Sequence, residues 1–108
     1  NDMSFKRGVT VAMLAFTLAA CSWVQLTEQG EDVRVMEASE VERCERVGKT
    51  TVRTTARAAG MDRHAEKVQA ELDVLARNSA VDIGGDTVVR QGVPQDGLQV
   101  YGVYRCLR

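Results

Sequence analysis

Apolar residues in the second half of the chain recur at spacings of three and four, which is the pattern of one face of an α-helix. Gly84-Gly85 follows the last of them, and glycine just past a periodic segment is typical of a helix C-terminus. Asp62 is a candidate N-cap at the other end. We therefore predict a long helix over residues 63–83. Its expected apolar face is Ala65, Val68, Leu72, Leu75, Ala76, Ala80 and Ile83.

Segments on both sides of this helix alternate polar and apolar residues or are rich in β-branched residues, as strands are. The polar stretch 37–42 is expected to form a turn with Val41 buried, and Gly48 marks a candidate bulge. Residues 56–60 and 91–97 are expected to be loops, the second with a possible hairpin turn at Asp96-Gly97. The predicted strands are 32–36, 44–55, 86–90 and 98–106.

The order β-β-α-β-β predicts a small α+β fold. A helix and a sheet that each have one apolar face bury those faces against each other, so the expected architecture is a two-layer sandwich. One long helix should pack on a mostly antiparallel sheet. If strands 44–55 and 86–90 are parallel neighbours, their connection through the helix is expected to be right-handed.

The first part of the chain has a different pattern. From Met3, the expected start, Lys6 and Arg7 precede the charge-free apolar run 9–20, and Cys21 follows. A positive segment before an apolar run of this length is typical of a signal peptide. The run is shorter than the roughly 20 residues of a membrane-spanning helix. The alternatives are an ordinary secretory leader with an incidental Cys21 and an uncleaved anchor.

The end of the run, Leu18-Ala19-Ala20-Cys21, resembles the lipobox of bacterial lipoprotein precursors. The resemblance implies that Cys21 is acylated, with palmitate-type chains, and that the chain is cleaved before it. Ser22 stands where an aspartate favours the inner membrane, so sorting to the outer membrane is expected. We predict a signal peptide over 1–20, a lipidated cysteine and short tether over 21–30, and a periplasmic α+β domain over 31–108.

Cys44 and Cys106 are the two remaining cysteines. A pair of cysteines in a small exported domain most simply forms a disulfide. A redox-active pair usually has the spacing Cys-x-x-Cys, which is absent. A metal site could combine both thiols with His64, the only histidine, but the spacing matches no known pattern. We therefore predict one disulfide, no metal and no cofactor.

Charge and composition exclude several classes of function. The formal net charge is −1 and aromatic residues make up 5% of the chain, so neither a basic field nor a stacking platform for nucleic acid is expected. With one histidine, no phosphate-binding glycine loop and no distinctive carboxylate pair, the chain shows no catalytic constellation. We predict that it is not an enzyme.

Several segments together resemble a group of small proteobacterial lipoproteins known only as a domain of unknown function. They are Leu26-Thr27 with Gly30, Val33-Arg34-Val35, Cys44 with Gly48, Ala76-Arg77-Asn78-Ser79-Ala80, Gly84-Gly85-Asp86-Thr87-Val88-Val89 and Gly102-Val103-Tyr104-Arg105-Cys106. The group is distantly similar to the outer-membrane lipoprotein sensor of the Rcs envelope-stress pathway, a disulfide-containing α+β domain. That sensor has two disulfides and a long proline-rich linker, whereas this chain has one candidate disulfide and a short tether.

Asn78 and Asp86 are the polar residues that we single out as candidates for binding. Asn78 lies within the predicted helix, where its amide would bind a ligand or a partner, or would hydrogen-bond a neighbouring loop. Asp86 follows Gly84-Gly85 and is expected to cap a turn or to lie in a pocket. The expected function is a non-enzymatic envelope module that binds an envelope protein or senses the state of the envelope. The alternative is a module that binds a small ligand or a metal.

Overall fold

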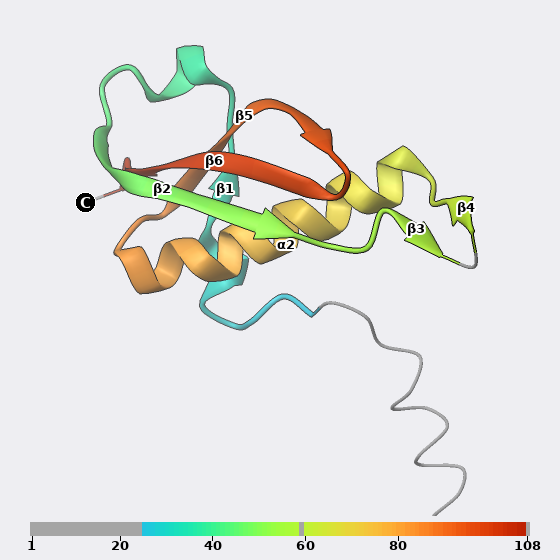
Figure 1. Cartoon of the computed structure of the whole chain (residues 1–108). Helices are drawn as coiled ribbons and strands as arrows, with labels where there is room; N and C mark the ends of the chain where they lie inside the picture. Colours follow the sequence, from blue (N-terminus) through green and yellow to red (C-terminus); the bar gives the residue numbers. More distant parts are fainter. Residues whose placement is uncertain (1–24, 59, 108) are drawn as a thin grey trace, which may run out of the picture.

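The computed structural model describes residues 25–58 and 60–107, which form one helix layer and one sheet layer (Figure 1). The helix α2 spans Ala65–Ile83. The main sheet has the strand order β1-β5-β6-β2, and two of its three pairings are antiparallel. The strand bounds are Arg34–Val35 for β1, Glu45–Arg53 for β2, Thr87–Gln95 for β5 and Leu98–Arg105 for β6. The predicted α+β sandwich is confirmed.

The strands before and after the helix are not neighbours in the sheet. β6 lies between β2 and β5 and is antiparallel to each of them, so β2 and β5 run in the same direction. The condition under which we expected a right-handed crossover between adjacent strands is therefore not met. The parallel neighbour of β5 is the two-residue strand β1, which pairs with Thr87 and Val88.

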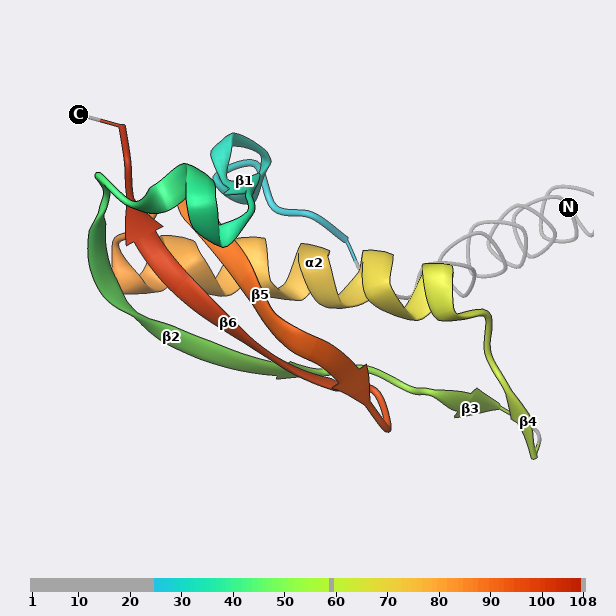
Figure 2. The same ribbon diagram turned by 90° about the horizontal axis from the view of Figure 1, so that it is seen from above.

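The chain segment between β2 and α2 forms a small second sheet. The strands β3 (Arg57–Ala58) and β4 (Met61–Asp62) form a two-stranded hairpin that projects from one end of the molecule (Figure 2). The loop predicted over 56–60 is thus wrong in part. Two-residue strands are too short to show an alternating pattern, and Arg57 and Asp62 join them through an exposed ion pair of 3.4 Å.

The sequence predicted the C-terminus of α2 correctly but not its N-cap residue. Asp62 is not the N-cap, because it belongs to β4; His64 has that position and makes no side-chain capping bond. At the C-terminus Gly84 adopts a φ of 89°, which favours glycine. The Gly85 N–H donates to Ala80 O at 2.9 Å, and the Gly84 N–H donates to Val81 O at 3.1 Å. The predicted stop at Gly84-Gly85 is confirmed.

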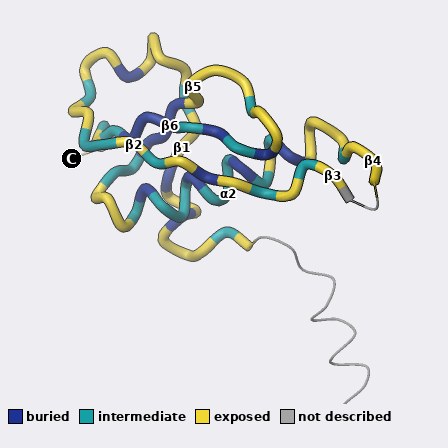
Figure 3. Tube along the Cα trace, viewed as in Figure 1, coloured by how far each residue is buried: buried dark blue, intermediate teal, exposed yellow. Residues whose placement is uncertain are grey.

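The core lies between α2 and one face of the sheet (Figure 3). Val68, Leu72, Ala76 and Ala80 recur every four residues and are buried, as predicted. The predicted face is too long at its ends, because Ala65 is exposed and Ile83 is 37% exposed. The buried core residues outside the helix are Val33, Val52, Val88, Tyr101 and Val103.

Irregularities in β2 and β5 determine which residues face the helix. The β2–β6 register shifts between Arg46 and Gly48, which confirms the predicted bulge. Val47 packs against the core, and a Cβ on Gly48 would lie 3.2 Å from Ile83, so both positions face α2. Asp96 and Gly97, with φ of 50° and 75°, form a two-residue hairpin turn. Only these two residues make the turn, and most of the predicted loop 91–97 belongs to β5.

The chain before β2 covers one end of the sandwich. The 3₁₀ turns η1 and η2 span Gly30–Asp32 and Ala38–Val41. Val41 is 4% exposed, which confirms the turn with a buried Val41. The predicted signal peptide and Cys21 lie outside the described residues. The described part of the expected tether, residues 25–30, packs against α2. No helix in the described ranges is long and apolar enough to cross a membrane.

Candidate functional site

The disulfide joins the start of β2 to the end of β6. Cys44 and Cys106 form an S–S bond of 2.09 Å, with their Cα atoms 4.6 Å apart. His64, the third residue of the alternative metal site, lies at the N-terminus of α2. Within the ranges that the structure describes, no three His, Cys, Asp or Glu side chains gather as metal ligands. A thiolate–metal site would therefore require reduction of this bond.

Asp86 holds the end of the chain beside the disulfide. Its Oδ1 accepts hydrogen bonds from Cys106 N at 2.8 Å and Thr87 Oγ1 at 2.9 Å, and its Oδ2 accepts one from Leu107 N at 2.9 Å. Burial alone raises the pKa of Asp86, but the N–H donors of Cys106 and Leu107 outweigh it and lower this pKa. The carboxylate thus caps backbone donors that follow β6, which agrees with the capping role considered for it.

Asn78 lies on the side of α2 opposite the core, two residues from the buried Ala76, and it binds the N-terminal segment. Its Oδ1 accepts from Thr27 N at 2.9 Å and from Thr27 Oγ1 at 3.1 Å, while its Nδ2 donates to Gln25 O at 3.0 Å. Gly30 is buried beneath this contact, where an added Cβ would lie 2.4 Å from Asn78 Oδ1. The amide therefore has partners within the chain, as in the neighbouring-loop alternative.

Arg77 extends this contact along the same segment. Its Nε donates to Val33 O at 2.8 Å and its guanidinium NH2 group donates to Glu31 O at 3.0 Å. Val33 itself is 3% exposed and belongs to the core. Arg77 and Asn78 together fix residues 25–33 on α2. We call this segment, with its contacts to Arg77 and Asn78, the N-terminal clasp.

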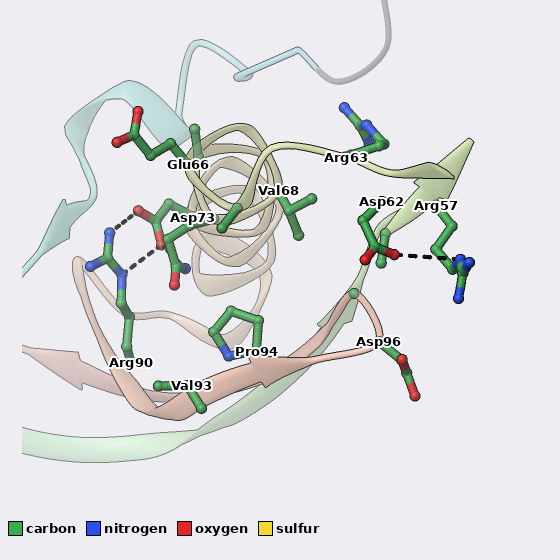
Figure 4. A pocket seen from close by; sticks show the side chains of 15 residues that line it. Arg57, Asp62, Arg63, Glu66, Val68, Asp73, Arg90, Val93, Pro94 and Asp96 are labelled. Atoms are coloured by element: carbon green, nitrogen blue, oxygen red, sulfur yellow. Dashed lines mark hydrogen bonds and ion pairs between the residues drawn. The ribbon is translucent and has the colours of Figure 1, made fainter. Parts of the chain in front are cut away.

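A cleft of about 960 Å³ lies between the first half of α2, the β5–β6 hairpin and the β3–β4 hairpin (Figure 4). Val68 of α2 lies across from Val93 and Pro94 of β5, and the charged ends of Glu66 and Asp96 point outward at the rim. Its lining residues are Ala56, Arg57, Asp62, Arg63, Ala65, Glu66, Val68, Gln69, Ala70, Asp73, Arg90, Val93, Pro94, Asp96 and Gly97. This size is within the range of small-molecule sites.

One end of the cleft is closed by hydrogen bonds centred on Asp73. Arg90 forms an ion pair with Asp73, and Tyr101 Oη donates to Asp73 Oδ1 at 2.5 Å. Gln69 Nε2 lies 3.1 Å from both of these oxygens. Burial and the bond to Asp73 raise the pKa of Tyr101, so its phenol stays protonated and donates. The hydrogen bond to Asp73 raises the pKa of Arg90.

A second group joins the hairpin to α2. Arg63 forms an ion pair with Glu71, and Thr54 Oγ1 donates to Glu71 Oε1 at 2.7 Å. The hydrogen bond from Arg63 lowers the pKa of Glu71, which keeps this acceptor ionised. Arg63 also donates to Thr55 O at 2.7 Å. These contacts hold the β3–β4 hairpin at the mouth of the cleft.

The sequence did not identify this cleft. Glu71 and Asp73 do not belong to the predicted apolar face of the helix, but their side chains are only 17% and 16% exposed. Their partners Arg63 and Arg90 lie in the predicted helix and in a predicted strand, where nothing in the sequence marks them as part of a site. An available signal was the spacing of Gln69 and Asp73, four residues apart and hence on the same face of the helix. The partner from β5 could be assigned only once the sheet was known.

Two of the three comparisons with known proteins give no match. No curated protein and no solved structure shows significant similarity to this chain. The model of a protein family described as a domain of unknown function, DUF4156, matches residues 24–106. The match includes the N-terminal clasp, the helix, the main sheet and both disulfide cysteines. The chain belongs to the DUF4156 family.

Proposed function

We propose that this protein is a lipid-anchored envelope module that binds a partner and catalyses no reaction. The observation that carries the proposal is Leu18-Ala19-Ala20-Cys21, which follows a positive segment and a charge-free apolar run. Cys21 is the acylation site, and Ser22 directs the protein to the outer membrane, facing the periplasm. Similarity to the Rcs stress sensor suggests that the module reports on the envelope as well as binding to it.

The disulfide supports export. Such bonds persist in oxidising compartments and are rare in the cytosol. The chain has three cysteines and the disulfide uses two, which leaves Cys21 as the one cysteine for the lipid. The N-terminal clasp begins at residue 25, so the anchored chain has no long linker between the lipid and the domain.

Intact mass of the membrane-extracted protein tests the anchor. We expect a chain that starts at Cys21 with added acyl mass, and two thiols that react with an alkylating agent only after reduction. Cys21→Ala should release the domain from membranes or leave the precursor unprocessed. A mature chain without acyl mass would contradict the anchor, and two thiols that react without reduction would contradict the disulfide.

The cleft favours a second candidate function, the binding of an elongated, largely apolar small molecule. Val68, Val93 and Pro94 supply apolar contacts in the middle, and ion pairs close the ends. An anilinonaphthalene dye is a suitable probe, because its fluorescence rises in apolar sites. Val93→Ser should weaken dye binding, whereas Val35→Ser, at an exposed valine outside the cleft, should not. Equal binding by both variants would exclude the cleft as the site.

A further inference from the structure

The sheet face that turns away from α2 carries exposed cations. Val52, Tyr101 and Val103 point to the helix, so their alternating neighbours point to the opposite side. On β2 these neighbours include Arg46, Lys49 and Arg53, all exposed. None of the three forms an ion pair with a described residue. We call the side of β2, β5 and β6 that faces away from α2 the open sheet face.

The open sheet face combines these cations with apolar surface. The half-buried Val100 and Leu98 of β6 lie opposite Thr51 and Arg53, and Arg46 lies over the Tyr104 ring at 6.0 Å. These described positions include no Asp or Glu, although the chain has a net charge of −1. The accessible residues of the face are Arg46, Lys49, Thr51, Arg53, Gln91, Leu98, Val100 and Tyr104, whereas Thr87, Val89 and Gly102 lie on the same side but are buried.

The arrangement suits an extended polyanion rather than a small ligand. Small molecules bind in concave pockets, and none of these residues lines the cleft described above. Lys49 and Arg53 are four residues apart on one strand, so their Cα atoms lie about 13 Å apart. Cations at such spacing complement anionic groups that repeat along a chain, while Leu98, Val100 and Tyr104 contact its less polar parts.

The N-terminal clasp determines which way the open sheet face points. Residues 25–30 lie below α2 in Figure 1, while the sheet lies above it. Asn78 is two residues from the core residue Ala76, about 200° around the helix. Four residues from Cys21 to Gln25 reach at most about 14 Å. With the proposed lipid on Cys21, the membrane therefore lies on the helix side and the open sheet face points away from it.

We propose that the open sheet face binds the carboxylate-bearing peptides of the cell-wall polymer, peptidoglycan, through Arg46, Lys49 and Arg53. The inference rests on the proposed function for its orientation. A membrane surface fits less well, because the anchor holds this face away from the lipid. The exposed cations of the face complement a polymer that carries free carboxylates. In the proposed orientation the face points into the periplasm, where peptidoglycan lies.

Sedimentation with purified cell-wall sacculi tests the proposal. The full chain, extracted from membranes in mild detergent, should sediment with sacculi at low ionic strength. Binding should fall when added salt shortens the Debye length from about 10 Å to about 3 Å. Lys49→Glu/Arg53→Glu should weaken binding by about tenfold or more, because it places like charges against the polymer. Lys49→Gln/Arg53→Gln, which preserves the strand without adding repulsion, should weaken it less.

The matched control is Lys67→Glu, which makes the same charge change at an exposed lysine of α2. It should bind like the wild type, whereas Lys49→Glu should not. Sacculi whose carboxylates have been converted to amides should no longer bind the protein. Equal binding by the two single variants, undiminished binding to amidated sacculi, or failure to bind sacculi would each overturn the proposal.

Two further outcomes would assign the face to a different ligand, and a third tests the anchor independently of the face. Binding to detergent micelles containing an anionic phospholipid, without binding to sacculi, would assign the face to lipid headgroups and overturn the proposal. A site-specific crosslink from Thr51 to one protein, with no binding to sacculi, would assign the face to that protein and also overturn it. A chain that carries no acyl mass but binds sacculi would remove the anchor and leave this surface in place.

Discussion

Asp86 makes the stability of the domain depend on pH. Its backbone donors lower its pKa on folding, so the ionised carboxylate adds stability above its ordinary pKa of about 3.9. That contribution is lost as the pH falls through the lowered folded value. Asp86→Asn should destabilise the domain by about 1–2 kcal/mol at neutral pH.

Urea unfolding of wild type and variant at pH 7 and near pH 3 checks this prediction. The difference between them should shrink at the lower pH, because the carboxyl of the unfolded wild type is then largely protonated and the contribution of the folded carboxylate declines. Asp82→Asn, at an exposed position near the end of α2, is the control and should change little at either pH. A difference that stayed constant with pH would show that the charge of Asp86 does not matter.

Gly30 is where a single methyl group should disturb the N-terminal clasp. A Cβ at this position would also lie 3.0 Å from Leu26 Cδ1 and Thr27 Oγ1. Gly30→Ala should therefore speed hydrogen exchange at the Thr27 amide, which donates to Asn78. Gly60→Ala adds its methyl group in open space and should leave that amide protected. Unchanged exchange in Gly30→Ala would mean that the clasp does not require close packing.

At this scale the sequence identified residues better than it identified their partners. Asn78 and Asp86 were selected as candidates because they are polar residues within or next to an apolar pattern. Both make several hydrogen bonds in the structure. Their partners Gln25 and Cys106 lie 53 and 20 positions away along the chain. Local spacing does not encode such contacts, since they depend on how the layers meet. Cys21 lies outside the described residues, and its lipidation stays a prediction.

Among the elements, β2 and β6 are held together by the disulfide as well as by their ladder. Cys44 and Cys106 close a loop with a sequence separation of 62. Restricting the unfolded chain by a loop of this size contributes roughly 4 kcal/mol. Cys44→Ser should lower the melting temperature by about 10 °C or more without affecting membrane association.

Calorimetry of wild type and Cys44→Ser, each with and without reducing agent, checks this prediction. Reduction should lower the melting temperature of the wild type and should not change that of the variant. Equal melting temperatures for oxidised wild type and Cys44→Ser would count against a stabilising bond.

The helix was predicted from its long repeating pattern, whereas the β3–β4 hairpin, which has no such pattern, was missed. The periodic face of α2 extends over five turns, so its existence did not depend on any single residue. β3 and β4 have two residues each, which is too few for alternation. β5 was predicted to end at residue 90, because Gly92 and Pro94 resemble loop residues. In the structure Gly92, with a φ of 69°, lies in the irregular part of the β5–β6 register.

At the scale of the whole molecule, the proposed anchor would put the lipid and the open sheet face on opposite sides, and this orientation is measurable. Ser79 lies near Asn78 on α2, whereas Thr51 lies on the open sheet face. Fluorescent labels on Ser79→Cys and Thr51→Cys should be quenched to different extents by quencher-bearing lipids in vesicles that contain the acylated protein. Stronger quenching at position 79 is expected. Equal quenching at the two positions would contradict a fixed orientation.

The positions of the clasp and the disulfide also determine how the domain, if it is anchored as proposed, would respond to a pulling force. Tension on the lipid would first reach the Asn78 contacts and then peel the chain away from α2 and from the edge of the sheet. Peeling would stop at Cys44, because its bond to Cys106 ties it to the end of β6, an inner strand of the sheet. The stretch freed between residues 25 and 43 extends by at most roughly 65 Å. With the proposed lipid in place, the disulfide would therefore limit how far the chain lengthens under tension and would keep β2, α2, β5 and β6 folded.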